Sequence, residues 1–209
     1  AALWLKQGRN QVDLGLLNKA LSAGTGEVRA AAVRVMGDWL SSFQREEALT
    51  LLNKAVTDPF PRVRIEAIRV LSKLSGAEPM DLALGALDLP SDRFIDYALW
   101  LNVQEHGEEW LAALMEKKIA AAERGKALEF VLANLPPAKA TAAISQLLPK
   151  PLPKDGSGPW LGLALKTGDA AVITAVYEQA ANGGFDDKTT LAALNGINEA
   201  IAQRQVKPS

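Results

Sequence analysis

The chain has 209 residues, of which 48% are hydrophobic, and this is enough apolar material for a continuous core. Lys and Arg total 23 against 24 Asp and Glu, and this balance, with a pI near 6.0, excludes a global positive field that gathers nucleic acid or anionic membranes. Cysteine is absent and His106 is the single histidine, which excludes thiolate catalysis, disulfides and metal sites that need cysteines or two histidines.

Residues 16–36 and 51–71 are two copies of one sequence unit. When the chain is shifted by 35 residues, ten of these 21 positions are identical. Background frequencies give only about one or two identities. The same shift places Trp4-Leu5 on Trp39-Leu40, so we expect the chain to begin near the end of a helix of a preceding repeat, as a fragment of a larger protein. The opening residues have neither the basic start nor the apolar run of a signal peptide, and no stretch has the length of a membrane span.

Each unit predicts two helices. Residues 45–57 form the first, because their apolar side chains recur at helical spacing. Asp58 and Pro59 end it, since the residue before a proline is disfavoured in the helical region and proline offers no N–H. Pro61 suits the first turn of the second helix, where a missing donor costs nothing. The second helix is apolar over so wide an arc that it must contact several neighbours, as in a stack of helical hairpins.

The two helices of this unit differ in how their side chains are distributed. In the first helix we expect a buried stripe of Ala48, Leu49, Leu51, Leu52 and Val56. In the second helix we expect a wider buried surface of Val63, Ala67, Val70 and Leu74, with Ile65, Ile68 and Leu71 beside it. The remaining strip of the second helix holds Arg62, Glu66, Arg69 and Lys73.

The later units keep this rhythm while their sequences diverge. Residues 78–107 predict a pair with a turn at Asp88 and Pro90 and a second helix from about Asp92 to Glu105. Residues 108–137 predict a further pair that ends at two prolines. The Pro/Gly-rich segment 149–159 is the clearest break, either a sub-boundary or a long loop between helices. Residues 160–204 predict three more helices, with breaks at 167–169 and 182–184.

No segment has the alternating pattern of a strand. The sequence therefore predicts an all-α fold, a right-handed α-α superhelix of about ten to twelve helices in hairpin pairs. We expect it to form a single domain over residues 1–209.

The repeated unit resembles a HEAT repeat, with an apolar first helix, Asp58 at the turn, and Val63-Arg64 followed by the small Ala67 in the second helix. In HEAT repeats the turn aspartate and this arginine usually pair within and between units. The resemblance therefore implies a structural ladder built from Asp58, Arg64, Arg29 and Asp88. We expect an incomplete ladder, because Ala23 takes the aspartate position of the first unit and Phe94-Ile95 replaces Val-Arg in the third. The resemblance covers about residues 1–135 and implies an armadillo-like solenoid.

Residues 87–114, LDLPSDRFIDYALWLNVQEHGEEWLAAL, are similar to the helical segment of large secreted bacterial haem-binding proteins. Those proteins join a dehydrogenase-like β-propeller, a HEAT array and a c-type cytochrome domain. Neither the propeller nor a Cys-x-x-Cys-His haem motif occurs in this sequence. The resemblance implies a spacer between two redox-related modules, in a periplasmic or secreted protein.

Arg34 and Arg69 are the first candidates for contact with a partner. They recur at equivalent positions of the second helices, which line the concave surface of HEAT arrays. One interpretation is a basic binding strip. The other is that both side chains are solvated near Glu27, Glu66 and Asp38, while Arg29 and Arg64 satisfy turn carboxylates or carbonyls. Charged helix faces commonly carry opposite charges, which favours the second interpretation.

The aromatic residues are the second group of candidates. The shared repeat position of Trp4 and Trp39 favours packing in the core over stacking on a sugar or a base, and we extend this expectation to the other tryptophans (Trp100, Trp110 and Trp160). Phe94, Tyr97 and Trp100 are spaced three apart on one side of a helix, with Asp96 among them. This cluster is the best candidate for a specific contact surface.

Catalytic alternatives have less support. Some HEAT-fold proteins are DNA glycosylases for alkylated bases, and Asp96, Tyr97 and Trp100 resemble the acidic and aromatic residues of such sites. Duplex binding depends on phosphate neutralisation and favours a basic protein, which this chain is not. Other HEAT-like proteins act as lyases on tetrapyrroles, but no cysteine or acid–base pair supports that activity. No phosphate loop, nucleophile elbow or paired-carboxylate motif is present.

We expect His106 to lie at the C-terminal end of a helix, just before Gly107, and Asp186-Asp187 to cap a helix. The sequence thus favours a non-catalytic scaffold or spacer with no cofactor and no metal site. Its expected partners are proteins or neighbouring domains of the same polypeptide, with no nucleic acid and no membrane. The alternative is a HEAT-fold nucleic-acid-processing enzyme such as an alkylpurine DNA glycosylase.

Overall fold

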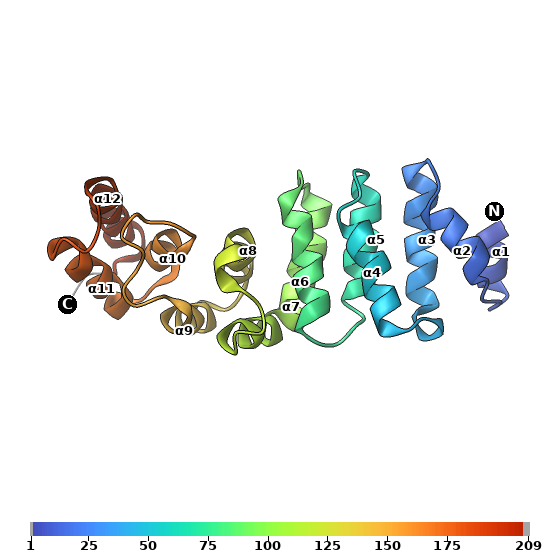
Figure 1. The fold of residues 1–209 in the computed structure, drawn as a ribbon, viewed down its shortest axis with the longest axis horizontal. Coiled ribbons are helices and arrows are strands. Elements are labelled where there is room, and N and C mark those ends of the chain that lie inside the picture. The colour runs from blue at the N-terminus through green and yellow to red at the C-terminus, as the bar shows by residue number, and fades with distance from the viewer. Residues whose placement is uncertain (1, 207–209) are drawn as a thin grey trace. The chain divides into compact units, whose positions relative to one another are not determined.

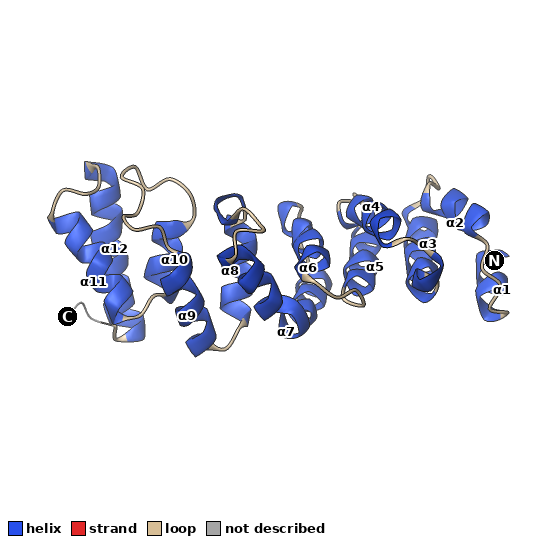
Figure 2. Cartoon of the chain, turned by 60° about the horizontal axis from the view of Figure 1, so that its bottom comes forward, coloured by secondary structure: helices blue, strands red, loops and turns tan. Residues whose placement is uncertain are grey.

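The computed structural model describes residues 2–206, and every regular element within that range is helical. Twelve α-helices and three short 3₁₀ helices follow one another along these residues (Figures 1 and 2). They group into two compact units, Ala1–Trp110 and Leu111–Ser209. The predicted all-α fold is confirmed, and the number of helices lies at the upper end of the predicted range.

The first unit consists of short helices that form hairpins. Its α-helices are α1 (Ala2–Gly8), α2 (Leu14–Leu21), α3 (Gly26–Asp38), α4 (Arg45–Val56), α5 (Pro61–Leu71), α6 (Ala77–Leu84) and α7 (Arg93–Met115), whose last residues fall in the second unit. The 3₁₀ helices are η1 (Leu40–Ser42) and η2 (Gly85–Asp88). The two copies of the repeated sequence are the hairpins α2/α3 and α4/α5, and their second helices α3 and α5 pack directly against each other. The repeats are therefore adjacent layers of one stack.

Local sequence explains where these helices begin and end. Pro61 occupies the first turn of α5, as predicted, and α4 ends at Val56, just before the Asp58-Pro59 pair. Asp13 starts α2, because its side chain accepts a hydrogen bond from the Leu16 N–H at 3.0 Å. Each hairpin turn is thus encoded within a few residues.

The core of the first unit lies where the helices of successive hairpins meet. Its fully buried side chains include Leu17, Met36, Leu52, Ile68 and Leu71. The expected stripe of α4 is buried except for Leu51, which is half-buried. Burial of these apolar side chains on two sides of α5 supplies most of the stabilisation that a single hairpin lacks.

The third hairpin differs from the prediction at its second helix. Its expected end near Glu105 is wrong, because α7 continues through Gly107 to Met115. His106 therefore lies within a helix, where its Nε2 is 2.9 Å from the carbonyl oxygen of Ser72 at the end of α5. Gly107 and Trp110 are buried, so packing outweighs the weak helix propensity of one glycine. The residues expected to open a fourth hairpin are instead the last turns of α7.

The second unit contains five complete helices after a short 3₁₀ turn. The 3₁₀ turn is η3 (Ala121–Glu123), and the five helices in the described part of this unit are α8 (Gly125–Asn134), α9 (Pro137–Leu147), α10 (Trp160–Thr167), α11 (Ala170–Ala181) and α12 (Asp187–Arg204). The three helices predicted after residue 160 are confirmed. Asp169 and Asp186 cap α11 and α12 by accepting hydrogen bonds from the Val172 and Thr189 N–H groups, at 2.9 and 2.7 Å. Within the range 2–206, none of the helices combines the length and the apolar character needed to cross a lipid bilayer.

Candidate functional site

Arginine side chains connect the turns of successive hairpins in the first unit. Arg29 of α3 donates from Nε and Nη2 to the two carboxylate oxygens of Asp58, at 2.7 and 2.8 Å. Its Nη1 donates to the carbonyls of Ala23 and Gly24 in its own turn, at 2.9 and 3.2 Å. Because both side chains of the ion pair are largely shielded from water, Arg29 joins two neighbouring turns by a two-point, charge-assisted contact.

Arg64 repeats this arrangement one hairpin later, through backbone acceptors. Its Nη1 donates to the carbonyl of Asp58 at 2.9 Å, and its Nη2 donates to the carbonyl of Pro90 at 2.6 Å. Asp88 ends η2 in that same turn. Arg64 is buried, and its Nε has no hydrogen-bond partner in the described part of the chain. Arg29 and Arg64 thus direct their hydrogen bonds to the turns of the hairpins, which is a structural role.

The ion pair changes the titration of both of its members. Partial burial raises the pKa of Asp58, but the hydrogen bonds from Arg29 and from the Phe60 N–H, with the charges of Arg29 and Arg64, outweigh it and hold the pKa below its ordinary value. The hydrogen bond to Asp58 raises the pKa of Arg29, against a smaller lowering by burial. Both groups therefore stay charged near neutral pH.

Arg34 and Arg69 are exposed on the second helices. The Nη1 of Arg69 lies 3.3 Å from Oε2 of Glu66, one turn earlier on α5. Glu66 is buried, although the sequence pattern places it on the charged strip of this helix. Among residues 2–206 we find no hydrogen bond or ion pair of the Arg34 guanidinium. These two arginines are thus exposed cations at equivalent positions of the two second helices.

The second helix of the third hairpin, α7, exposes aromatic side chains where α3 and α5 expose arginines. Phe94, Tyr97, Trp100 and Leu101 of α7 are 56%, 61%, 39% and 41% exposed, and we call these four residues the α7 strip. The rings of Tyr97 and Trp100 are stacked, with centroids 5.7 Å apart and planes inclined by 19°. The Arg93 guanidinium lies 4.7 Å from the centroid of the Phe94 ring. The α7 strip is therefore an ordered, partly cationic aromatic surface.

The start of α7 orients this strip. Asp92 Oδ1 accepts hydrogen bonds from the N–H groups of Phe94 and Ile95, at 2.8 and 3.0 Å, which satisfies two free donors of the first turn. Asp96, the acidic candidate within the cluster, accepts a hydrogen bond from the Ser91 hydroxyl. Ile95 is fully buried on the opposite side of the helix. Anchoring of that side directs the aromatic rings of the strip to solvent.

The strip occupies the repeat position of the two exposed arginines. A shift of 31 residues from α5 to α7 places Ala67 on Ala98, both of them buried, and places Arg69 on Trp100. Since Arg34 and Arg69 are related by the shift of 35, the exposed position changes from arginine to tryptophan in the third hairpin. Sequence reasoning found both groups of residues but did not connect them, although the register that puts Phe94-Ile95 in place of Val63-Arg64 already implies this equivalence.

The other tryptophans mostly belong to the core. Trp39, Trp110 and Trp160 are buried as predicted, and the indole Nε1 of Trp110 donates to Asp81 Oδ1 at 3.0 Å. Trp4 is exposed on α1, so the core prediction is wrong for Trp4 as well as for Trp100 of the α7 strip. In the range that the structure covers, no three acidic or histidine side chains are grouped so that they could hold a metal ion.

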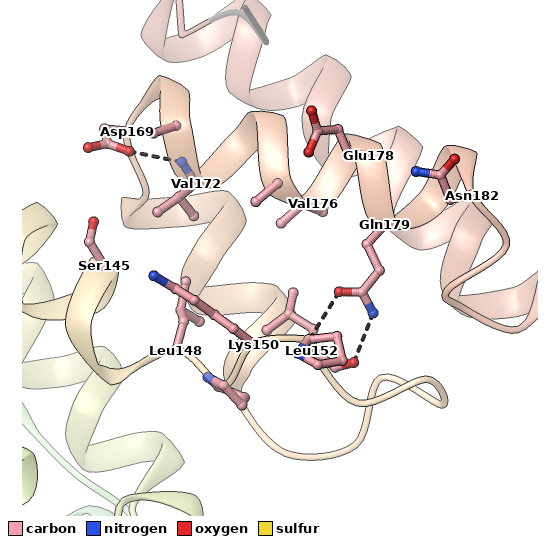
Figure 3. A pocket seen from close by; sticks show the side chains of 14 residues that line it. Ser145, Leu148, Lys150, Leu152, Asp169, Val172, Val176, Glu178, Gln179 and Asn182 are labelled. Atoms are coloured by element: carbon pink, nitrogen blue, oxygen red, sulfur yellow. Dashed lines mark hydrogen bonds between the residues drawn. The ribbon is translucent and has the colours of Figure 1, made fainter.

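A second candidate site, a pocket, lies in the second unit, and sequence reasoning missed it. A pocket of about 500 Å³ opens between the segment that follows α9 and one face of α11 (Figure 3). Its apolar walls are formed mainly by Leu148, Leu152, Val172 and Val176. The Pro/Gly-rich composition of residues 149–159 indicated a loop, but not that this loop folds back on a helix more than twenty residues later.

Comparison with known proteins matches part of the first unit to a recognised class of repeats. Residues 14–100 match the family model of HEAT repeats, and this segment spans α2 to α6 and the start of α7. The match confirms the HEAT resemblance of the repeated unit. No curated protein and no solved structure matches the chain significantly.

Proposed function

We propose that this chain is a non-catalytic scaffold or spacer that contacts a protein partner, or a neighbouring domain of the same polypeptide, through the second helices of its first unit. The observation that carries the proposal is the α7 strip, in which four large apolar side chains on one helix are exposed together. Exposed apolar groups that lie together are typical of surfaces that another molecule covers. HEAT repeats generally mediate contacts between proteins, which supports a protein as that molecule.

The chemistry of this surface suits a partner with both apolar and acidic groups. Tyrosine, tryptophan and arginine are the side chains that most often dominate protein interfaces. Tyr97 and Trp100 are already stacked, so little side-chain entropy is lost when a partner covers them. Arg34 and Arg69 offer guanidinium groups at the same repeat position as Trp100, where they can bind carboxylates of the partner.

The spacer part of the proposal is supported by the ladder and by the narrower resemblance. Arg29 and Arg64 tie each turn to the next, which resists bending between hairpins. From the sequence of residues 87–114 we propose a kinship with the helical segment of large secreted haem-binding proteins, in which such an array separates two folded modules. In that setting we propose that this chain holds its neighbours apart and carries no redox chemistry.

Site-specific photocrosslinking tests the contact surface directly. A benzophenone amino acid at position 97, in the full-length protein in its native cells, should crosslink to one defined protein or to another domain of the same polypeptide. The same probe at Lys54, exposed on α4, is the control and should give no such product. The affinity for the purified partner should then fall when Tyr97 and Trp100 are both changed to Ala. Equal crosslinking from positions 97 and 54 would refute the proposal that the α7 strip is the contact surface.

The alternative, a nucleic-acid-processing enzyme, requires binding to DNA, which a separate experiment tests. Fluorescence anisotropy of a labelled DNA duplex at low ionic strength should show no saturable binding, because the chain has no net positive charge. Saturable binding that weakens steeply with salt and is lost in Arg34→Gln with Arg69→Gln would favour the enzyme instead.

A further inference from the structure

The pocket of the second unit has the dimensions of a small-molecule site. Its volume of about 500 Å³ lies within the usual range of ligand pockets. Leu148, Leu152 and Val176 are buried side chains that form its walls, and the exposed Ala171 and Ala175 border its opening on α11. An apolar ligand of moderate length would therefore find apolar contacts on both sides.

The pocket is built on a pinned loop. The Gln179 side chain accepts a hydrogen bond from the Leu152 N–H at 3.0 Å and donates to the Leu152 carbonyl at 2.8 Å (Figure 3). The Asp186 N–H donates to the carbonyl of Lys154 at 3.0 Å, which holds the loop a second time. Prolines at 149, 151 and 153 further restrict its backbone. Because the wall is ordered without a ligand, binding costs little rearrangement.

Three charged side chains, Lys150, Asp169 and Glu178, are among the residues that line the pocket, and they differ in where they point. The Lys150 side chain runs along the pocket, and its ammonium group lies at the end near Ser145 (Figure 3). Asp169 is turned to the start of α11, where it accepts the Val172 N–H. The Glu178 carboxylate points away from Leu148 and Leu152. The cation that accompanies the apolar walls is therefore Lys150, and its natural complement is an anionic head group.

We infer that this pocket binds an apolar acid, such as a medium-chain carboxylate, with the chain between the loop and α11 and the carboxylate beside Lys150. This inference is independent of the protein-binding role of the first unit, which uses other residues. Apolar burial supplies most of the affinity, and the ion pair selects the sign of the head group.

Isothermal titration of the full chain with three ligands of equal chain length tests the inference. Decanoate, decan-1-ol and decylamine should bind in that order of affinity, with one site for decanoate and about a threefold advantage over the alcohol, as expected for a solvent-exposed ion pair. Lys150→Met keeps the apolar stem and should reduce decanoate binding to the level of the alcohol. Raising the salt concentration should also weaken decanoate binding, because salt screens the ion pair.

A blocking variant separates this pocket from other surfaces. Ala175→Trp should fill the opening and abolish binding of all three ligands, while Ala202→Trp on the exposed side of α12 should change nothing. Far-UV circular dichroism of both variants checks that they are folded. Undiminished binding in Ala175→Trp, or tighter binding of decylamine than of decanoate, would overturn the inference. Binding of the blocked peptide acetyl-Leu-Leu-amide without binding of decanoate would assign the pocket to a protein segment instead.

Discussion

Replacing Gly37 by alanine tests whether the repeats stack in the described register. Gly37 lies near the end of α3, where it is buried against α5. A Cβ atom at this position would lie 2.6 Å from Cγ2 of Val70 and 3.5 Å from Nζ of Lys73. Lys73, just after α5, also donates from Nζ to the Gly37 carbonyl at 3.0 Å, which is a second contact between the two hairpins at this point.

Two opposing effects set the size of the change. Alanine in place of glycine favours a helix by about 1 kcal/mol. Ordinary carbon contacts require about 3.5–4.0 Å, so α3 and α5 must move apart by about 1 Å to admit the new methyl group. Overpacking of this kind costs about 1–3 kcal/mol. We therefore expect Gly37→Ala to lower the free energy of unfolding by about 1 kcal/mol in spite of its better helix propensity.

The assay is urea unfolding followed by tryptophan fluorescence in a Trp160→Phe background. The four remaining tryptophans (Trp4, Trp39, Trp100 and Trp110) then all report on the first unit. Val70→Ala removes the clashing methyl groups, so it should cost clearly less in the Gly37→Ala variant than in the parent. Gly15→Ala in α2, where the new methyl meets only an ordinary contact at 3.7 Å, is the matched control and should be neutral or stabilising. Additive effects of Gly37→Ala and Val70→Ala would show that α3 and α5 do not touch as described.

Two further predictions concern polar groups of the first unit. Because the pKa of Asp58 is below its ordinary value in the folded protein, its contribution to stability is complete above the unfolded-state pKa and is lost as the pH falls through the lowered folded-state value. The melting-temperature difference between the parent and Asp58→Asn should therefore be constant near neutral pH and shrink below about pH 4, and a pH-independent difference would contradict this account. Asn102 is fully buried with neither amide atom hydrogen-bonded within the described residues, at the repeat position of Met36 and Leu71. Asn102→Leu should raise the free energy of unfolding by about 1–2 kcal/mol, whereas a loss of stability would mean that the amide has a partner.

The predictable features depend on atoms close together in the sequence. Pro61 and Asp186 start helices through contacts within three residues, so the local sequence predicted both. At Asp169 the sequence predicted only a break at 167–169, and the structure adds that this side chain caps α11. Gly107 shows the limit of such signals. A glycine in a helix costs only about 1 kcal/mol, and the burial of Trp110 and its neighbours in α7 outweighs it.

The sequence by itself determined that this protein is helical, that its first half repeats one hairpin, and where most hairpins turn, because periodicity and backbone restrictions act over a few residues. Only the tertiary structure decided which charged groups are buried, as for Glu66, and which partner each arginine finds, as for Arg64 and the Pro90 carbonyl. It also decided that residues 148–152 and α11 enclose a pocket. Burial and long-range hydrogen bonds depend on atoms contributed by segments far away in the chain, and no local pattern specifies their distance.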